Sequence, residues 1–352
     1  MDKGIRSYVP CLLMLILLLG VPLGNLIDDE NRKLTQADHQ PTSARAQTTW
    51  SGVIELTDSY TVNVTDELII TPCTVVKLPN AARLFVDGRI IVQGDTSCRV
   101  TLDRVSNGLH YGIQFNQSSY GRGSVIDNLS IENSMYGITI YGSNPILNNV
   151  TVVNPSRVGV DLFSSANPTI RDLFVDQSGR GFSYADWRFG IGLSVGAGSA
   201  PVVERAVLSD TRIRGLNIWG DSGGIYRQIT IDNITAEGAL AISAGVWVED
   251  SRPLITNVSV DKSDYGILIR HIDDGGYTRA VVRDCLVTNS MYRGIYIDKA
   301  NHTNFTNYES ADFTNTVVRG TGGPNAKTSN IGFAAIEVNA TGAWFENLSL
   351  IH

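Results

Sequence analysis

The sequence predicts an all-β fold in which one short strand–turn pattern recurs about nine times, each copy forming one coil of a stacked solenoid. Three observations predict this fold. A four-residue motif recurs along the chain, a glycine followed by an alternating strand comes after each copy, and no hairpin dipeptide joins the strands. The composition agrees, because 34 glycines and only 18% charged residues are typical of a turn-rich β protein.

The first motif consists of Asn or Asp, an apolar residue, Ser or Thr, and a second apolar residue. Its copies begin 21 to 33 residues apart, so the shortest coil is compact and the longer coils carry insertions. Such short alternation is the pattern of a strand with one buried side. The copies, several of them imperfect, begin at Asn128, Asn149, Asp172, Arg205, Gln228, Asn257, Asp284, Asn315 and Asn347.

The second motif is a glycine followed by four or more residues that alternate in polarity. We expect the first and third residues after the glycine to face the core, and the second and fourth to face outward. The glycines are Gly137, Gly159, Gly190, Gly215, Gly245, Gly266 and Gly294. We also expect a positive φ in the turns before six of these glycines, at Asn133, Asn154, Asp176, Asp210, Asp261 and Asn289.

These repeats resemble those of right-handed parallel β-helix proteins, the superfamily that includes pectate lyases and polygalacturonases. The resemblance covers residues 50–352 and implies a right-handed parallel β-helix of about 9–11 coils. We expect the first coils over 50–127 and the regular repeats over 128–352. The enzymes' catalytic motifs are absent apart from Asp273-Asp274, so the resemblance implies the fold and not an activity.

The N-terminal segment has the features of an export signal. Lys3 and Arg6 precede an apolar run from Val9 to Val21, and acidic residues follow it. We expect residues 1–27 to form a signal peptide or, if uncleaved, a membrane anchor, and residues 28–49 to form a flexible stalk. The expected location is therefore extracellular or at the cell surface, with the chain either secreted or tethered at its N-terminus.

The cysteines also suit an oxidising compartment. Cys73 and Cys98 are 25 residues apart, about one coil, so they are expected to stack and form a disulfide. Proteins of the resembling superfamily usually have Pro-Gly where this chain has Pro72-Cys73, which also indicates that Cys73 was recruited for a bond. Cys285 lies at an inward position and is expected to be a buried thiol.

The outward positions after the repeat glycines form an aromatic face that gives way to a charged one. Aromatic rings offer apolar platforms to the C–H faces of sugars, and Arg and carboxylates bind hydroxyl or acidic groups. The alternative is a structural role, in which the rings shield the sheet and the charges form a stabilising ladder. The candidate carbohydrate-binding residues are Tyr141, Phe163, Trp219, Trp247 and Tyr296.

The charged part of the same face supplies the candidates for catalysis. Glu249 and Asp298 are expected two coils apart, a separation that suits an inverting glycosidase, although Arg270 between them would keep both ionised. A lyase would instead use Arg270 or Lys299 as the base. A calcium ion would then bind the carboxylates of Asp273, Asp274 and Asp298.

Ten Asn-x-Ser/Thr sequons predict N-glycosylation, but four of them coincide with the repeat asparagines, where the side chain has a structural use. The better candidates lie outside the repeat register at Asn63, Asn116, Asn301 and Asn304. The last repeat stops in mid-coil, so we expect the chain to be truncated at its C-terminus or its last coil to be covered by a capping domain or partner.

We therefore expect an exported β-helix protein that binds a polysaccharide or surface glycan, or acts as a structural or adhesive module. The alternative is a polysaccharide lyase or glycosidase acting on an acidic polysaccharide. No cofactor other than calcium is indicated. The net charge of −7 argues against nucleic acid as a partner, because an acidic surface repels phosphates.

Overall fold

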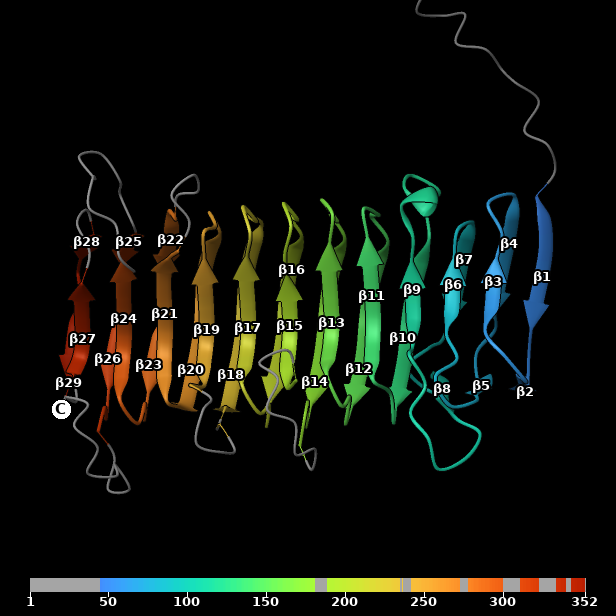
Figure 1. The fold of residues 1–352 in the computed structure, drawn as a ribbon, viewed down its shortest axis with the longest axis horizontal. Helices are drawn as coiled ribbons and strands as arrows, with labels where there is room; N and C mark the ends of the chain where they lie inside the picture. The colour runs from blue at the N-terminus through green and yellow to red at the C-terminus, as the bar shows by residue number, and fades with distance from the viewer. Residues whose placement is uncertain are drawn as a thin grey trace, which may run out of the picture. The chain divides into compact units, whose positions relative to one another are not determined.

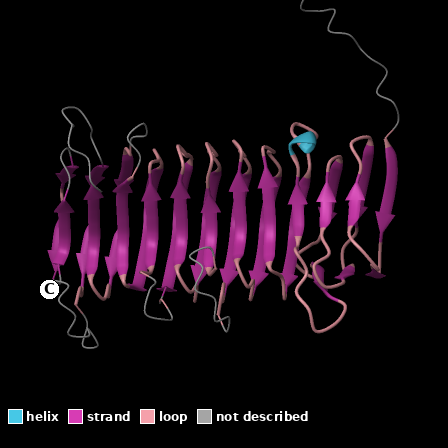
Figure 2. Cartoon of the chain, viewed as in Figure 1, coloured by secondary structure: helices cyan, strands magenta, loops and turns pink. Residues whose placement is uncertain are grey.

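The computed structural model describes residues 45–180, 189–234, 236, 242–272, 278–299, 311–322, 334–339 and 343–351. Within these ranges the chain is a parallel β-helix, as the repeats predict. Two parallel sheets form it, and in each sheet the strands of consecutive coils lie side by side (Figure 1). The only helix among the described residues is one turn of 3₁₀ helix, η1 (Gln117–Ser119) (Figure 2).

One sheet, here called sheet B, contributes one strand to each coil. Its strands pair in the order in which the chain forms them. They are β3 (Tyr60–Val62), β6 (Leu84–Val86), β9 (Ile113–Phe115), β11 (Tyr136–Tyr141), β13 (Val158–Phe163), β15 (Ile191–Val195), β17 (Arg214–Trp219), β19 (Ala244–Glu249), β21 (Tyr265–His271), β24 (Arg293–Lys299) and β27 (Ala334–Asn339).

The other sheet, sheet A, contributes either one long strand or two short ones to each coil. Its strands are β1 (Ala46–Trp50), β2 (Val53–Glu55), β4 (Asp66–Ile70), β5 (Val75–Leu78), β7 (Arg89–Gln93), β8 (Val100–Arg104), β10 (Val125–Glu132), β12 (Ile146–Val153), β14 (Thr169–Asp176), β16 (Val202–Ser209), β18 (Ile225–Ile234), β20 (Leu254–Ser263), β22 (Ala280–Arg283), β23 (Leu286–Thr288), β25 (Ala311–Thr314), β26 (Val317–Arg319), β28 (Ala343–Glu346) and β29 (Ser349–Ile351). The β-helix thus begins at Ala46, earlier than the expected start at residue 50.

The recurring Asn or Asp of the first motif is the corner that divides sheet A. All nine motif positions have a positive φ, between 50° and 56°. Asn128 illustrates the effect: the residues before it pair with β7 and those after it pair with β8. One left-handed residue changes the phase of the alternation, so Ile126 and Leu129, on either side of the corner, both face the core.

Side-chain amides link these corners from coil to coil. The Asn149 Nδ2 donates to Asn128 Oδ1 at 2.5 Å, and the same ladder recurs farther along, where Asn347 donates to Asn315 at 3.1 Å. The amide nitrogen of a repeat Asn is therefore already used inside the protein.

The turns before the repeat glycines agree less well with the sequence. In two of them the residue with a positive φ is Gln177 or Lys262, one position after the expected Asp176 or Asp261.

The core is a single apolar cluster that runs between the two sheets from Trp50 to Val318. Inward residues alternate with outward ones in every strand, and most inward Ile, Val and Leu side chains are fully buried. A β-helix places each of them against its equivalent in the next coil about 4.8 Å away, so columns of similar residues form continuous packing.

A disulfide joins the turns of two neighbouring N-terminal coils. Cys73 and Cys98 are bonded, with their Cα atoms 5.0 Å apart. Cys73 has a φ of 64°, a left-handed conformation that favours glycine. Cys285 is a buried free thiol, as expected, and burial raises its pKa to about 11.

The corner ladder leads to a test by substitution. We expect Asn149→Ala to lower the free energy of unfolding by about 2 kcal/mol, because alanine in a left-handed conformation costs about 1 kcal/mol and a hydrogen bond is lost. Asn149→Gly should recover the conformational part. Urea unfolding of unglycosylated protein measures both values. Equal losses for the two variants would show that alanine is not strained by the positive φ at position 149.

The disulfide leads to a second test. We expect Cys98→Ser to lower the free energy of unfolding by about 3 kcal/mol, since the bond closes a loop between residues 25 apart. Adding Cys73→Gly should restore part of the loss, because glycine tolerates the φ of 64°. A Tm for the double variant at or below that of the single one would argue against this account.

Candidate functional site

The candidate site lies on the outer face of sheet B, where residues at equivalent strand positions stand side by side. At the second position after the repeat glycine, Thr139 pairs with Asp161, and Asp161 pairs with Ser194. At the fourth position Tyr141 pairs with Phe163. The stacking of coils therefore brings together a polar row and an aromatic row that are distant in sequence.

The structure corrects the expected register of one coil. We expected Gly190 to be its repeat glycine, but Gly192 takes that place between Gly159 and Gly215. A shift of two residues keeps every side chain on the same face, so alternation alone cannot distinguish the two registers. In the observed register Ser194 lies beside Asp161, and Gly196 lies in the aromatic row.

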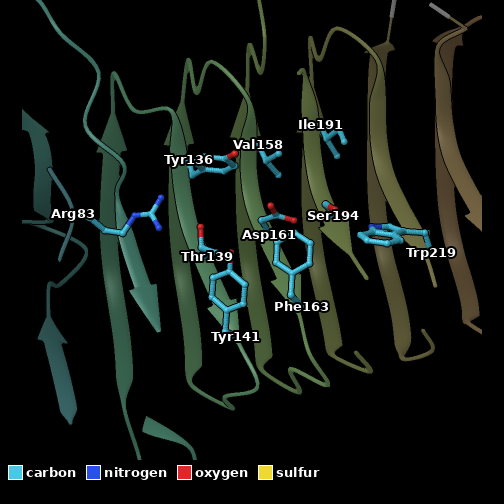
Figure 3. Close-up of a pocket in the computed structure, with 10 residues that line it drawn as sticks. All are labelled: Arg83, Tyr136, Thr139, Tyr141, Val158, Asp161, Phe163, Ile191, Ser194 and Trp219. Atoms are coloured by element: carbon cyan, nitrogen blue, oxygen red, sulfur yellow. The ribbon is translucent and has the colours of Figure 1, made fainter. Parts of the chain in front are cut away.

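These rows line a cavity of about 360 Å³. Its floor is the polar row, one side is formed by aromatic rings, and the other side is formed by Tyr136, Val158 and Ile191. Figure 3 shows Arg83 at one end and Trp219 at the other, with the side chain of Asp161 between them. The full lining is Arg83, Tyr136, Thr139, Tyr141, Val158, Asp161, Phe163, Ile191, Ser194 and Trp219.

The floor of the cavity carries polar groups that lack partners. Asp161 is only 5% exposed, and its Oδ1 has no hydrogen-bond partner within the described part of the chain. The same holds for the Thr139 hydroxyl on the neighbouring strand. A buried polar atom without a partner costs free energy, so a site that keeps two of them side by side is suited to a hydrogen-bonding ligand.

Burial also changes the acidity of the floor. Desolvation raises the pKa of Asp161 to about 7, and a hydrogen bond from Ser194 opposes the shift. Burial, followed by the negative charge of Asp161, raises the pKa of Tyr141 as well. Asp161 thus changes between an acid that donates a hydrogen bond and a carboxylate that only accepts one near neutral pH.

The aromatic row forms a platform beside this floor. The rings of Tyr141 and Phe163 are inclined by 18° with centroids 5.4 Å apart, a parallel arrangement with a large offset. Figure 3 shows both faces turned the same way, side by side. The Tyr141 side of the platform is open to solvent, because that residue is 37% exposed.

Trp219 stands across the end of the platform. Its indole is inclined by 75° to the Phe163 ring, with centroids 6.1 Å apart, and it lies over Gly196. A Cβ atom at Gly196 would come within 2.6 Å of three indole atoms, so only glycine leaves room for this ring position. The indole of Trp219 therefore occupies the space that a side chain at Gly196 in the preceding coil would take.

Arg83 lies at the opposite end of the cavity. Its guanidinium lies over the rings of Tyr111 and Tyr136, 5.1 and 5.8 Å from their centroids, and donates to the Gln114 amide oxygen. These contacts hold the cation on the aromatic surface. Sequence reasoning did not single out Arg83 because it precedes the regular repeats.

Trp247 corrects an expectation, because it is not an open platform. Its side chain is only 5% exposed, with the guanidinium of Arg214 3.8 Å and that of Arg270 5.4 Å from its ring centroid. Arg214 is in turn held by Asn217 at 2.7 Å, and burial lowers its pKa to about 10. Tyr296 packs against the same second apolar cluster, which contains Trp247 and Tyr265.

The expected charged ladder is present on the strands that follow. Glu249 pairs with Arg270, and Arg270 pairs with Asp298, on β19, β21 and β24. Glu249 accepts a hydrogen bond from the Trp247 indole at 3.1 Å and lies 3.9 Å from the Arg270 guanidinium. Opposite charges on neighbouring strands stabilise a sheet, so this arrangement is suited to a structural role.

The calcium hypothesis rests largely outside the described residues, because Asp273 and Asp274 lie there. Within the described residues no group of three or more His, Cys, Asp or Glu side chains could hold a metal ion.

Two of the four candidate glycosylation sites, Asn301 and Asn304, also lie outside the described residues. Asn63 is exposed, whereas the amide nitrogen of Asn116 donates to Asp87 at 3.0 Å.

Comparison with known proteins agrees with the fold. A family model described as a right handed beta helix region matches residues 88–240. The sequence has no significant match among curated proteins. No helix in the described part of the chain is long and apolar enough to cross a membrane, and the apolar run from Val9 to Val21 lies outside that part.

Two solved structures show the same architecture. The alginate lyase from Paenibacillus sp. str. FPU-7 is 11% identical with a TM-score of 0.50, and the match covers 84% of this chain and 99% of that one. A mutant of the periplasmic alginate epimerase AlgG is 11% identical with a TM-score of 0.53, covering 85% of this chain and 76% of that one. The described part of the chain thus has the fold of a right-handed parallel β-helix.

The buried acid leads to a pH test. The pKa of Asp161 is about 7 in the folded protein against an ordinary value of 3.8. The folded state therefore binds more protons between these values, and stability falls as pH rises through them. Asp161→Asn removes this loss. We expect the variant to gain up to about 4 kcal/mol of stability relative to the wild type between pH 4 and pH 8.

Thermal unfolding at several pH values measures this gain. Asp58→Asn, which changes an exposed carboxyl, serves as the matched control and should not show it. A constant difference between Asp161→Asn and the wild type across this pH range would refute the raised pKa.

Proposed function

We propose that this protein binds carbohydrate in the cavity on the outer face of sheet B. One observation carries the proposal: two parallel aromatic rings lie beside a buried polar row in which the Thr139 hydroxyl and the Asp161 Oδ1 lack partners. Sugars have this same division of surfaces, with apolar C–H faces and polar hydroxyls at the ring edge. Each part of the cavity therefore matches one part of a pyranose.

The floor and the platform contribute in different ways. The platform at Tyr141 and Phe163 removes apolar sugar surface from water. The carboxyl of Asp161 and the hydroxyl of Thr139 form hydrogen bonds with sugar hydroxyl groups, which would otherwise lose their hydrogen bonds on burial. The charged ladder at Glu249 and Arg270 lies beyond Trp219 and contributes to the face outside the cavity.

Other properties of the chain support an exported glycan-binding protein. The N-terminal apolar run, the disulfide and the sequons all suit an oxidising compartment outside the cytoplasm. Two solved structures of similar fold are an alginate lyase and an alginate epimerase, which act on a polysaccharide. We therefore propose that the partner is a polysaccharide or surface glycan.

A second candidate function is catalysis on a polysaccharide, by a lyase or glycosidase mechanism. The observation that favours it is the buried Asp161, whose pKa of about 7 suits a group that transfers a proton near neutral pH. Incubation with acidic and neutral polysaccharides distinguishes the two functions. New reducing ends or unsaturated products that disappear in Asp161→Asn would establish catalysis, and their absence leaves binding as the function.

The binding proposal is tested by an array of linear oligosaccharides. The array should include gluco-, xylo- and manno-oligosaccharides and the mannuronate, guluronate and galacturonate series. We expect the wild type to bind at least one class and Phe163→Ala to weaken that binding about tenfold or more, since a lost aromatic contact costs about 1.4 kcal/mol.

Phe174→Ala is the matched control for this experiment. Phe174 is 38% exposed on β14 of sheet A, so its removal deletes the same ring from the opposite face. Binding should be unchanged in this variant. Equal losses in both variants, or no binding by the wild type to any class, would contradict the proposal.

A further inference from the structure

The platform beside Asp161 is open in one direction along the row of strands and closed in the other. Tyr141 and Phe163 lie on adjacent strands, and their ring centroids are 5.4 Å apart. Adjacent strands are about 4.8 Å apart, a distance close to the length of one pyranose residue in a linear glycan. A chain running across the strands would thus place consecutive residues on consecutive rings.

Trp219 interrupts this path. Phe163 and Trp219 belong to strands two positions apart in sheet B, so their backbones are about 10 Å apart, twice the strand spacing. Their ring centroids are only 6.1 Å apart because the indole leans across the space above Gly196. The inclination of 75° makes the indole a wall at the end of the platform, where a third parallel ring would have extended it.

From this geometry we infer that the site recognises the end of a glycan chain, holding its last two sugar residues on Phe163 and Tyr141 with the terminal residue against Trp219. The inference rests on the proposed carbohydrate binding. The rest of the chain leaves the cavity on the side of Arg83. The floor under the terminal residue is Asp161, so the terminal sugar also meets the buried polar groups.

The wall predicts how affinity depends on chain length. A protein that holds chain ends binds one site on every chain, so its affinity per mole of chains stays the same once two residues are present. A protein that binds internal segments finds more sites on longer chains, and its affinity per mole of chains rises with length. The two cases differ without any knowledge of the sugar's identity.

The test uses the di-, tetra- and hexasaccharide of the class that binds best on the array, with calorimetry or competition expressed per mole of chains. We expect the di- and hexasaccharide to bind the wild type with affinities within about twofold of each other. A two-residue site that accepted internal segments would instead bind the hexasaccharide about fivefold more tightly, because that chain offers five positions and the disaccharide only one. We also expect capping of one particular end, either the reducing or the non-reducing one, to weaken binding at least tenfold. Capping of the other end should leave binding unchanged.

Two variants test the wall itself. Gly196→Ala should displace the indole while leaving Tyr141, Phe163 and Asp161 in place, because its Cβ atom would occupy the space of the ring. Trp219→Ala removes the ring. In both variants we expect the hexasaccharide to bind at least threefold more tightly than the disaccharide, and capping either end to lose its effect.

The outcomes separate this inference from the proposed function. If no oligosaccharide binds the folded wild type, both fail. If oligosaccharides bind with affinity that rises with length and capping neither end matters, chain-end recognition is overturned and the carbohydrate site remains. Phe174→Ala, with its substitution on sheet A, should behave like the wild type throughout. Circular dichroism and thermal unfolding confirm that each variant is folded.

Discussion

The structure depends on the parallel pairing of each strand with its equivalent in the next coil. This pairing places side chains of the same strand position about 4.8 Å apart in continuous columns. The inward columns of Ile, Val and Leu bury one another and form the core. The same constraint acts on the outward columns, so a polar row and an aromatic row become the floor and side of one cavity.

The candidate site arises where one column departs from its regular pattern. Most positions of the aromatic row carry a side chain, but Gly196 carries none, and the indole of Trp219 leans over it. Below it, Asp161 occupies a row in which Thr139 and Ser194 are neutral. The coils are otherwise similar, so one glycine and one acidic residue are enough to give this part of the face its own shape and charge.

The charged ladder and the second aromatic cluster show the opposite outcome. Trp247 has the residue type of a sugar platform, but Arg214 and Arg270 cover its ring. Glu249 is held by the indole of Trp247 and lies beside Arg270. These residues contact one another rather than leaving their side chains open to a ligand, and such contacts stabilise the face of the sheet. The groups around Asp161 instead line a cavity together with the rings of Tyr141 and Phe163, and that difference locates the candidate site.

The sequence by itself determined the fold, the disulfide pair of Cys73 and Cys98, and the adjacency of Tyr141 with Phe163 and of Arg270 with both Glu249 and Asp298. A repeat assigns each residue to a column, and columns become neighbours in a solenoid. Only the tertiary structure decided the register at Gly192, because a shift of two residues leaves the alternation unchanged. The burial of Trp247 and Asp161 was also decided there, since burial depends on the side chains of neighbouring coils that close over a position.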